Sequence, residues 1–331
     1  MANQQESSLS YSYNDLRIEV SHYLGWGRDL NAFGLNEGGE SQLQVIDACV
    51  KSGLMKFYVN SRGHQWSFLK PTYEFSVWPS FTALAGRTVT VSTTTVTATG
   101  TTVFYASMIG KTITANSASA VITAVNTTAQ TLTVATSLGS ASGQTWTMTA
   151  DGTYQLADNY AGLDGPITFT DTTNYRPLRN RGDSWIRAAK QLSQTASRPL
   201  EYAIRPKTSD GSAGQRWDLL LWPIPDAVYT LSFRMLVAPN TLTDSTYPYP
   251  FGYQLHGETI LSSCLAVAEA RENDDRGRGP MYEEFQDRLT ASIEADKKVG
   301  ASEFLGYNGD GDPQDDWRPA YYVTVDGVVP S

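Results

Sequence analysis

Few residues in this chain combine a type and a spacing suited to catalysis or ligand binding. Gly110-Lys111-Thr112 matches the end of a phosphate-binding loop, in which backbone amides and a lysine hold phosphate groups. The glycine that this motif requires five residues earlier is Tyr105, and the flanking residues have the pattern of strands. We therefore expect a turn between strands at Gly110, without nucleotide binding.

A second candidate is a run of alternating oxygen-bearing side chains, Asn308, Asp310 and Asp312, which is typical of a calcium-binding loop. Such loops place a glycine at their sixth position and a bidentate glutamate at their twelfth. Here those positions hold Pro313 and Pro319. The stretch is better interpreted as a solvated acidic loop, with weak cation binding as the alternative, and we predict no metal site.

Histidine and cysteine are too dispersed to predict a site. The chain contains His22, His64, His256, Cys49 and Cys264. No metalloprotease spacing is present, neither cysteine has a basic neighbour that would activate it, and both are expected to be buried free thiols. His256 and Glu258 are close in sequence, but they point to different sides of a helix, so a role at a helix end or an interface is favoured. We predict no catalytic residue, no cofactor and no enzymatic activity.

Charge is distributed unevenly along the chain. Between residues 176 and 207 eight basic residues face only two acidic ones, and between 269 and 316 fourteen acidic residues face six basic ones. The basic residues are Arg176, Arg179, Arg181, Arg187, Lys190, Arg198, Arg205 and Lys207. Two interpretations stay open: two solvated surfaces of one molecule, or a head-to-tail contact in which the basic strip of one subunit meets the acidic face of the next.

Helical patterns lie at both ends of the chain and would position these residues. Near the N-terminus, one helix is expected to follow an N-cap at Asn14, and a second to start at Ser41. Near the C-terminus, helices are expected over 253–271 and from Pro280 to Gly300. Each has only one apolar stripe. We therefore predict one small bundle formed by both chain termini.

The middle of the chain has the pattern of strands. From 88 to 150 the only charged residue is Lys111, about one residue in three is threonine, and β-branched residues alternate in short runs between glycines. About six strands are expected there, as a small barrel or sandwich. The rest of 151–240 is also strand-like, with a short helix around Arg187–Ser193.

These elements predict an α+β fold with a discontinuous organisation. The helical core is formed by 1–65 and 250–300, a β region by 66–87 and 151–249, an inserted Thr-rich β module by 88–150, and an extended C-terminal arm by 301–331. The net charge of −9 argues against a protein that grips nucleic acid through its phosphates. No apolar run approaches the roughly 20 residues of a membrane span, and no secretory signal is visible.

The order of several segments resembles that of head-to-tail adaptor (connector, or head completion) proteins of short-tailed bacteriophages. The segments are Ala48-Cys49-Val50-Lys51-Ser52-Gly53-Leu54-Met55-Lys56-Phe57-Tyr58, Trp66-Ser67-Phe68-Leu69, Gly165-Pro166-Ile167-Thr168-Phe169, Arg198-Pro199-Leu200-Glu201-Tyr202 and Leu219-Leu220-Leu221-Trp222-Pro223-Ile224-Pro225, followed by the C-terminal helices. The similarity is one of pattern and covers most of the chain. The block from about 88 to 149 looks like an addition to the smallest such adaptors.

The resemblance implies a virion protein of the neck, made in the host cytoplasm. Its subunits form a ring, twelve in number in such adaptors, between the portal protein and a tail nozzle or tail tube protein, and double-stranded DNA passes through the lumen without specific binding. The arm is implied to dock on the portal, with Trp317, Tyr321 and Tyr322 as an aromatic anchor. The basic residues Arg176, Arg179, Arg181, Arg187 and Lys190 are the other predicted interface residues.

Two competing interpretations remain. The first is a β-rich carbohydrate-binding or adhesin-type virion protein, in which Trp78 and Trp146 form stacking platforms. The second is an enzyme whose site is assembled from dispersed residues such as His256, Glu258 and Asp171, which no motif supports. A glycan screen separates the first interpretation from an adaptor, which is expected to bind no glycan.

Overall fold

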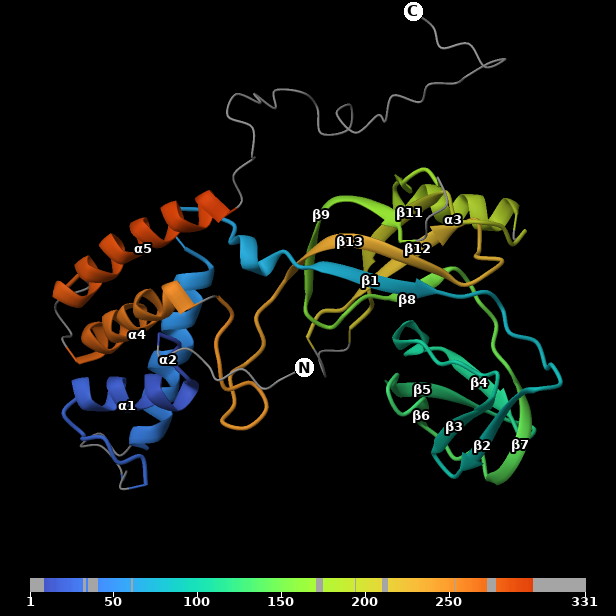
Figure 1. Cartoon of the computed structure of the whole chain (residues 1–331), viewed down its shortest axis with the longest axis horizontal. Coiled ribbons are helices and arrows are strands. Elements are labelled where there is room, and N and C mark those ends of the chain that lie inside the picture. Colours follow the sequence, from blue (N-terminus) through green and yellow to red (C-terminus); the bar gives the residue numbers. More distant parts are fainter. Residues whose placement is uncertain are drawn as a thin grey trace, which may run out of the picture. The chain divides into compact units, whose positions relative to one another are not determined.

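The chain folds into two compact units in a computed structural model. One unit contains residues 1–68 and 241–331, and the other contains 69–240. The structure describes residues 9–31, 34, 41–60, 62–170, 175–193, 195–209, 214–252, 254–272 and 278–299. Helices and sheets occupy different parts of the chain, which confirms the predicted α+β class (Figure 1).

The first unit, which we call the helical unit, is built from both ends of the chain. Its helices are α1 (Tyr13–Tyr23), α2 (Gln42–Tyr58), α4 (Gly257–Glu272) and α5 (Pro280–Val299), with a short turn of 3₁₀ helix, η3 (Gln254–His256), before α4. Helix α4 packs against the other three. Its contact with α2 is so close that a Cβ atom on Gly53 would lie 2.6 Å from the Cα atom of Cys264. Glycine is therefore required there for the two helices to meet.

The helix ends follow the local sequence, with one correction. Helix α1 begins after Ser12, whose hydroxyl accepts a hydrogen bond from the backbone of Asp15 while the Asp15 carboxylate accepts one from the Ser12 backbone. The predicted N-cap at Asn14 is wrong because this reciprocal capping box starts the helix two residues earlier. Ser41 is the N-cap of α2, and Pro280 opens α5 as predicted.

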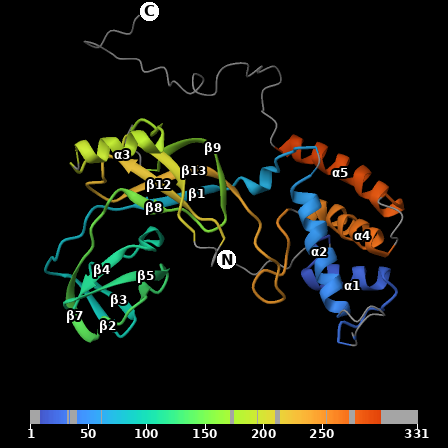
Figure 2. The ribbon, with the colours of Figure 1, turned by 180° about the vertical axis from the view of Figure 1, so that it is seen from behind.

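The second unit contains a closed barrel, described below, and two open sheets, which together with helix α3 (Asp183–Leu192) we call the β unit. One sheet has the order β1-β13-β9 and the other has the order β10-β11-β12-β8. Their strands are β1 (Thr72–Val77), β8 (Thr153–Gln155), β9 (Tyr160–Phe169), β10 (Arg179–Asn180), β11 (Glu201–Pro206), β12 (Trp217–Trp222) and β13 (Tyr229–Val237). Figure 2 shows β13 beside β1 from behind, and β13 also pairs with β9. Helix α3 (Asp183–Leu192) starts earlier than the predicted Arg187–Ser193.

The Thr-rich block forms a closed six-stranded barrel in the order β2-β3-β6-β5-β4-β7. Its strands are β2 (Arg87–Ser92), β3 (Thr95–Gly100), β4 (Thr112–Ala115), β5 (Ala118–Asn126), β6 (Thr131–Val134) and β7 (Ser140–Thr147). Alternate side chains fill its interior, among them Val89, Ile113, Leu132 and Trp146. Closure removes the exposed strand edges that an open sheet would leave unpaired.

The barrel contacts the open sheets where the chain enters and leaves it, and also through the short 3₁₀ helix η2 (Ala106–Met108), where the Ser107 hydroxyl donates to the Ser76 carbonyl of β1. Phe81 and Met148 form an antiparallel bridge, and the backbone amide of Ala150 donates to the Ser80 hydroxyl over 2.9 Å. Lys111, the only charged residue between 88 and 150, forms a 2.6 Å ion pair with Asp151 just outside the barrel. Gly110 lies in a turn with a φ of 80°, as expected for a strand connection and unlike a nucleotide-binding loop.

Candidate functional site

Helix α3 carries the most distinctive exposed side chains of the β unit. Ile186 packs on Ala203 of β11 and Leu220 of β12, which fixes the helix on the four-stranded sheet. This packing turns Trp185 outward, where it stays 41% exposed and meets Trp222 edge to face at 5.5 Å. An exposed tryptophan on a firmly packed helix is typical of a protein–protein contact.

Several cations of the predicted basic strip are paired within the chain. Arg181 lies 3.1 Å from Glu201, Arg187 lies 2.9 Å from Asp183, and Arg205 lies 3.6 Å from Asp183. The Arg181–Glu201 and Arg205–Asp183 pairs hold the end of β10 and the N-terminal end of α3 against β11, whereas Arg187–Asp183 is an i,i+4 pair within α3. Part of the basic strip therefore stabilises the fold through ion pairs within the chain. A count of charges in the sequence does not reveal these pairs.

Lys190 has a structural role in this part of the fold. Its amine donates to the carbonyl oxygens of Asp151 and Gly152 over 2.7 and 3.0 Å, and to the Thr153 hydroxyl over 3.3 Å. Burial lowers the pKa of Lys190 to about 8. Of the five basic residues predicted for the interface, it offers the least charge to a partner.

The other predicted interface residues form a more open surface. Arg179 and Arg176 are exposed, and the Arg181 guanidinium lies 5.3 Å from the centre of the Trp185 ring. Leu192, one turn beyond the middle of α3, is 88% exposed. We call Arg179, Arg181, Trp185, Ala188 and Leu192 the α3 face; tryptophan and arginine are the side chains most enriched at binding hot spots.

The predicted arm cannot be placed in the same way. Trp317, Tyr321 and Tyr322 lie outside the described residues, as do Asn308, Asp310 and Asp312 of the calcium-like stretch. Within the described ranges, no group of histidine, cysteine or carboxylate side chains is arranged to hold a metal ion. No helix in those same ranges is long and apolar enough to cross a membrane.

The helical unit contains a buried polar cluster that the sequence did not predict. The Asp296 carboxylate on α5 accepts hydrogen bonds from the backbone amide and hydroxyl of Ser67, over 3.0 and 2.5 Å, and lies 2.7 Å from Nε2 of His64. Asp296 is only 2% exposed. The segment after α2 is thereby clamped to the C-terminal half of α5.

Aromatic rings surround this clamp. Phe57, Trp66 and Phe68 lie within 6 Å of the His256 ring, between centroids, and Trp66 lies 5.0 Å from His64. Burial lowers the pKa of His256, and the neighbouring Asp296 carboxylate offsets this only in part. Burial also acts to raise the pKa of Asp296, but the hydrogen bonds from Ser67 and His64 lower it below its ordinary value.

The clamp has serine, histidine and aspartate without the geometry of a catalytic triad. In a triad the histidine contacts the serine hydroxyl and takes its proton. Here the Ser67 hydroxyl donates to Asp296, and His64 contacts the other oxygen of the same carboxylate. Both partners converge on one acceptor, so the arrangement fixes structure and does not activate a nucleophile.

His256 and Glu258 do not converge, in agreement with the sequence prediction. The imidazole is fully buried among aromatic rings, whereas Glu258 accepts a hydrogen bond from the Tyr11 hydroxyl and pairs with Arg288 of α5. Asp171, the third residue of the enzyme interpretation, lies outside the described part of the chain.

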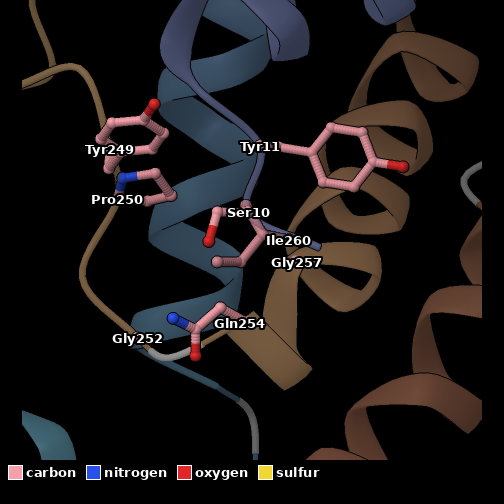
Figure 3. A pocket seen from close by; sticks show the side chains of 8 residues that line it. All are labelled: Ser10, Tyr11, Tyr249, Pro250, Gly252, Gln254, Gly257 and Ile260. Atoms are coloured by element: carbon pink, nitrogen blue, oxygen red, sulfur yellow. The ribbon is translucent and has the colours of Figure 1, made fainter. Parts of the chain in front are cut away.

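A pocket of about 220 Å³ opens beside the start of α4 (Figure 3). Its lining residues are Ser10, Tyr11, Tyr249, Pro250, Gly252, Gln254, Gly257 and Ile260. They offer hydroxyl and amide groups but no carboxylate, imidazole, thiol or amine. Among the described residues, the lining of this pocket supplies no acid or base that could catalyse a reaction near neutral pH.

The carbohydrate-binding interpretation loses its stacking platforms. Trp78 is 0% exposed and Trp146 is 1% exposed, the latter inside the barrel, where its indole nitrogen donates to the Thr102 hydroxyl. A sugar ring cannot reach either indole. The prediction that these tryptophans are exposed platforms is wrong because both fill cores.

Comparison of the chain with models of protein families finds no match, and neither does a search among curated proteins. The function is accordingly argued from the residues and the fold.

Proposed function

We propose that this chain is a head-to-tail adaptor of a tailed virion, which joins the portal to the tail as a ring and forms part of the DNA channel. The observation that carries the proposal is the helical unit assembled from both chain ends around α4, with the β unit as the intervening chain. The segments that resemble short-tailed phage adaptors therefore belong to two compact units, and each unit has a surface of its own. A protein that links two partners requires two such surfaces.

The charge of the chain is compatible with a DNA channel. Its net charge is −9, and Glu283, Asp287 and Glu294 are exposed along one side of α5. A lumen lined by such residues repels phosphate, so DNA slides past without being held. We propose that acidic residues of the C-terminal helices face the lumen.

The partners follow from the same proposal. The subunits form a ring, of twelve by analogy with the adaptors that the chain resembles. The arm, residues 301–331, docks on the portal through Trp317, Tyr321 and Tyr322, and the β unit contacts a tail nozzle or tail tube protein. The site of action is the neck of the virion, after synthesis in the host cytoplasm.

The decisive experiment is to mix the purified chain with a portal protein and to image the complex by electron microscopy. A ring stacked coaxially on the portal is expected. A chain that stays monomeric and never associates with portal particles would contradict the proposal.

A matched variant tests the role of the C-terminal segment. A chain ending at residue 301 retains every helix of the helical unit and is expected to keep its circular dichroism spectrum but to lose portal binding. The full-length Trp317→Ala variant is expected to show a weaker form of the same defect. Portal binding by the truncated chain at full strength would remove 302–331 from the interface.

A further inference from the structure

The α3 face has the composition of a binding surface for an acidic, partly apolar peptide. We propose that it binds residues 301–316 of a second copy of this chain, an inference that rests on the proposed ring. The occupant is thus the first half of the C-terminal segment. Trp317, Tyr321 and Tyr322 remain available to the portal.

The geometry of the α3 face supports a single elongated partner. Trp185 and Leu192 are seven residues apart on α3 and so lie on the same side of the helix, with the exposed Ala188 between them. The apolar strip therefore runs along most of the helix. Helix α3 packs on the sheet through Ile186, and Trp185 and Leu192 are exposed on another side of the helix. Together these two side chains form an exposed apolar surface.

Positive charge lies at one end of this strip. The Arg181 guanidinium lies 5.3 Å from the Trp185 ring, and the exposed Arg179 lies two residues before Arg181 in the sequence, on the short strand β10. Within the described ranges Arg179 forms no ion pair. Arg181 shares only one carboxylate, that of Glu201. The guanidinium groups are thus positioned to receive carboxylates from a partner.

Residues 301–316 match both properties of the surface. They contain five carboxylates and no basic residue: Glu303, Asp310, Asp312, Asp315 and Asp316. They also carry Phe304, Leu305 and Tyr307, which suit the strip between Trp185 and Leu192. The segment follows α5 in the sequence, and 16 fully extended residues span at most about 55 Å.

The charge balance favours this occupant over nucleic acid. The chain as a whole repels phosphate, with a net charge of −9. A peptide brings both carboxylates for the arginines and side chains for Trp185 and Leu192, whereas a phosphate backbone satisfies the arginines alone. Crosslinking to added DNA in place of the peptide would contradict the proposal.

The test is photo-crosslinking in the full-length chain. Trp185 is replaced by benzoylphenylalanine, which keeps an aromatic ring at this position, and equal amounts of ¹⁵N-labelled and unlabelled copies are assembled and irradiated. Mass spectrometry is expected to identify peptides from 301–316 joined to the probe, with labelled copies linked to unlabelled ones. Links confined to single copies, or capture of other segments only, would overturn the proposal.

Two controls keep the outcome specific. The same probe in place of Val121, which is 44% exposed on the barrel, is expected to capture no peptide from 301–316. Arg179→Glu removes an unpaired exposed arginine without disturbing a fold contact, and is expected to lower the crosslink yield about fivefold. Unchanged yield with Arg179→Glu would refute the role of charge.

The crosslinking experiment tests the inference about α3, and the portal assay tests the adaptor function, so one can fail without the other. A ring that binds the portal without capture of 301–316 overturns only the inference about α3. Capture between copies in a chain that never binds a portal supports the inference and contradicts the adaptor function.

Discussion

The helical unit and the Thr-rich barrel are stabilised in different ways. In the helical unit, charged side chains cross between segments: Arg17 of α1 pairs with Asp47 of α2 at 2.6 Å, and the buried Asp296 clamps α5 to Ser67 and His64. In the barrel the only charged residues are Arg87, at the start of β2, and Lys111, which pairs with Asp151 outside the barrel. Its strands are held by backbone hydrogen bonds and an apolar interior.

The two regions therefore differ in what determines which segments pair and in how much charge their surfaces carry. Buried charges fix which segments meet, at a cost in desolvation, and removal of one partner leaves the other uncompensated. A barrel closed by backbone pairing needs no such contacts, so its surface is free to be uniformly neutral. Changes in charge are therefore expected to affect the two regions very differently.

The largest effect on the helical unit is expected for Asp296→Asn. It removes the charge that His64 and Ser67 satisfy, and is expected to destabilise the helical unit by about 3 kcal/mol. Hydrogen–deuterium exchange mass spectrometry, which resolves individual segments, is expected to show faster exchange in α5 and unchanged exchange in the barrel. Glu294→Gln, at an exposed position on the same helix, is the control and is expected to have no effect. Equal protection in both variants would contradict the clamp.

Acidification is expected to separate the same two regions. The pKa of His256 is lowered in the folded chain, so the unfolded chain takes up a proton first as the pH falls below about 6.5, and stability is lost. The lowered pKa of Asp296 adds a further loss below about pH 4. The barrel has no acidic residue or histidine between 88 and 150.

The measurement is the urea midpoint followed by circular dichroism at the helix band, at about pH 7 and about pH 5. A lower midpoint is expected at the lower pH. Proteolysis within the barrel strands is expected to be equally slow at both values with an acid-tolerant protease. A helix transition independent of pH would show that His256 does not remain neutral in the folded chain.

A smaller effect is expected for Lys111→Met. The ion pair with Asp151 is 2.6 Å long, but Asp151 is 60% exposed, so water and salt screen it. The loss is about 1 kcal/mol or less. Faster hydrogen exchange is expected at residues 110–112 and 151–153, with strands β2 and β3 unchanged. Lys51→Met, at an exposed position of α2, serves as the control. Slower exchange at the barrel joint in Lys111→Met would contradict this role.

The smallest effect is expected for Thr145→Lys. Thr145 is exposed on β7, and a surface substitution there is expected to change stability by less than about 0.5 kcal/mol. Trp146→Lys, one residue further along the same strand, places a charge inside the barrel and is expected to unfold it. Thermal unfolding of both variants measures the contrast. A large loss in Thr145→Lys would show that the neutral surface is needed for folding.

Much of the fold was accessible from local sequence. Alternating β-branched residues between glycines predicted about six strands in the Thr-rich block, and the apolar stripes predicted the four helices of the helical unit. Closure of the barrel was not accessible, because it depends on the pairing of β7 with both β2 and β4. Nor was the start of α3, because Asp183 and Ser184 continue a polar stretch in the sequence.

The candidate site was less accessible. The arginines of the basic strip were visible as a count, but the pairing of Arg205 with Asp183 depends on how α3 lies against β11. His64 and Asp296 are 232 residues apart, and no local motif connects them. Trp185 carried a signal that was missed: an aromatic residue beside an arginine on the polar side of a short amphipathic helix.

The joint between the barrel and the β unit has a consequence for how such a chain can change over generations. Ser80 and Ala150 are hydrogen-bonded neighbours, so the segment between them leaves and re-enters the β unit at one point. Two crossovers in the gene, one at each of these positions, would exchange the whole insert while the two flanking segments keep their spacing. The barrel is thus an exchangeable module, and related chains can carry a different module, or a simple turn, in its place.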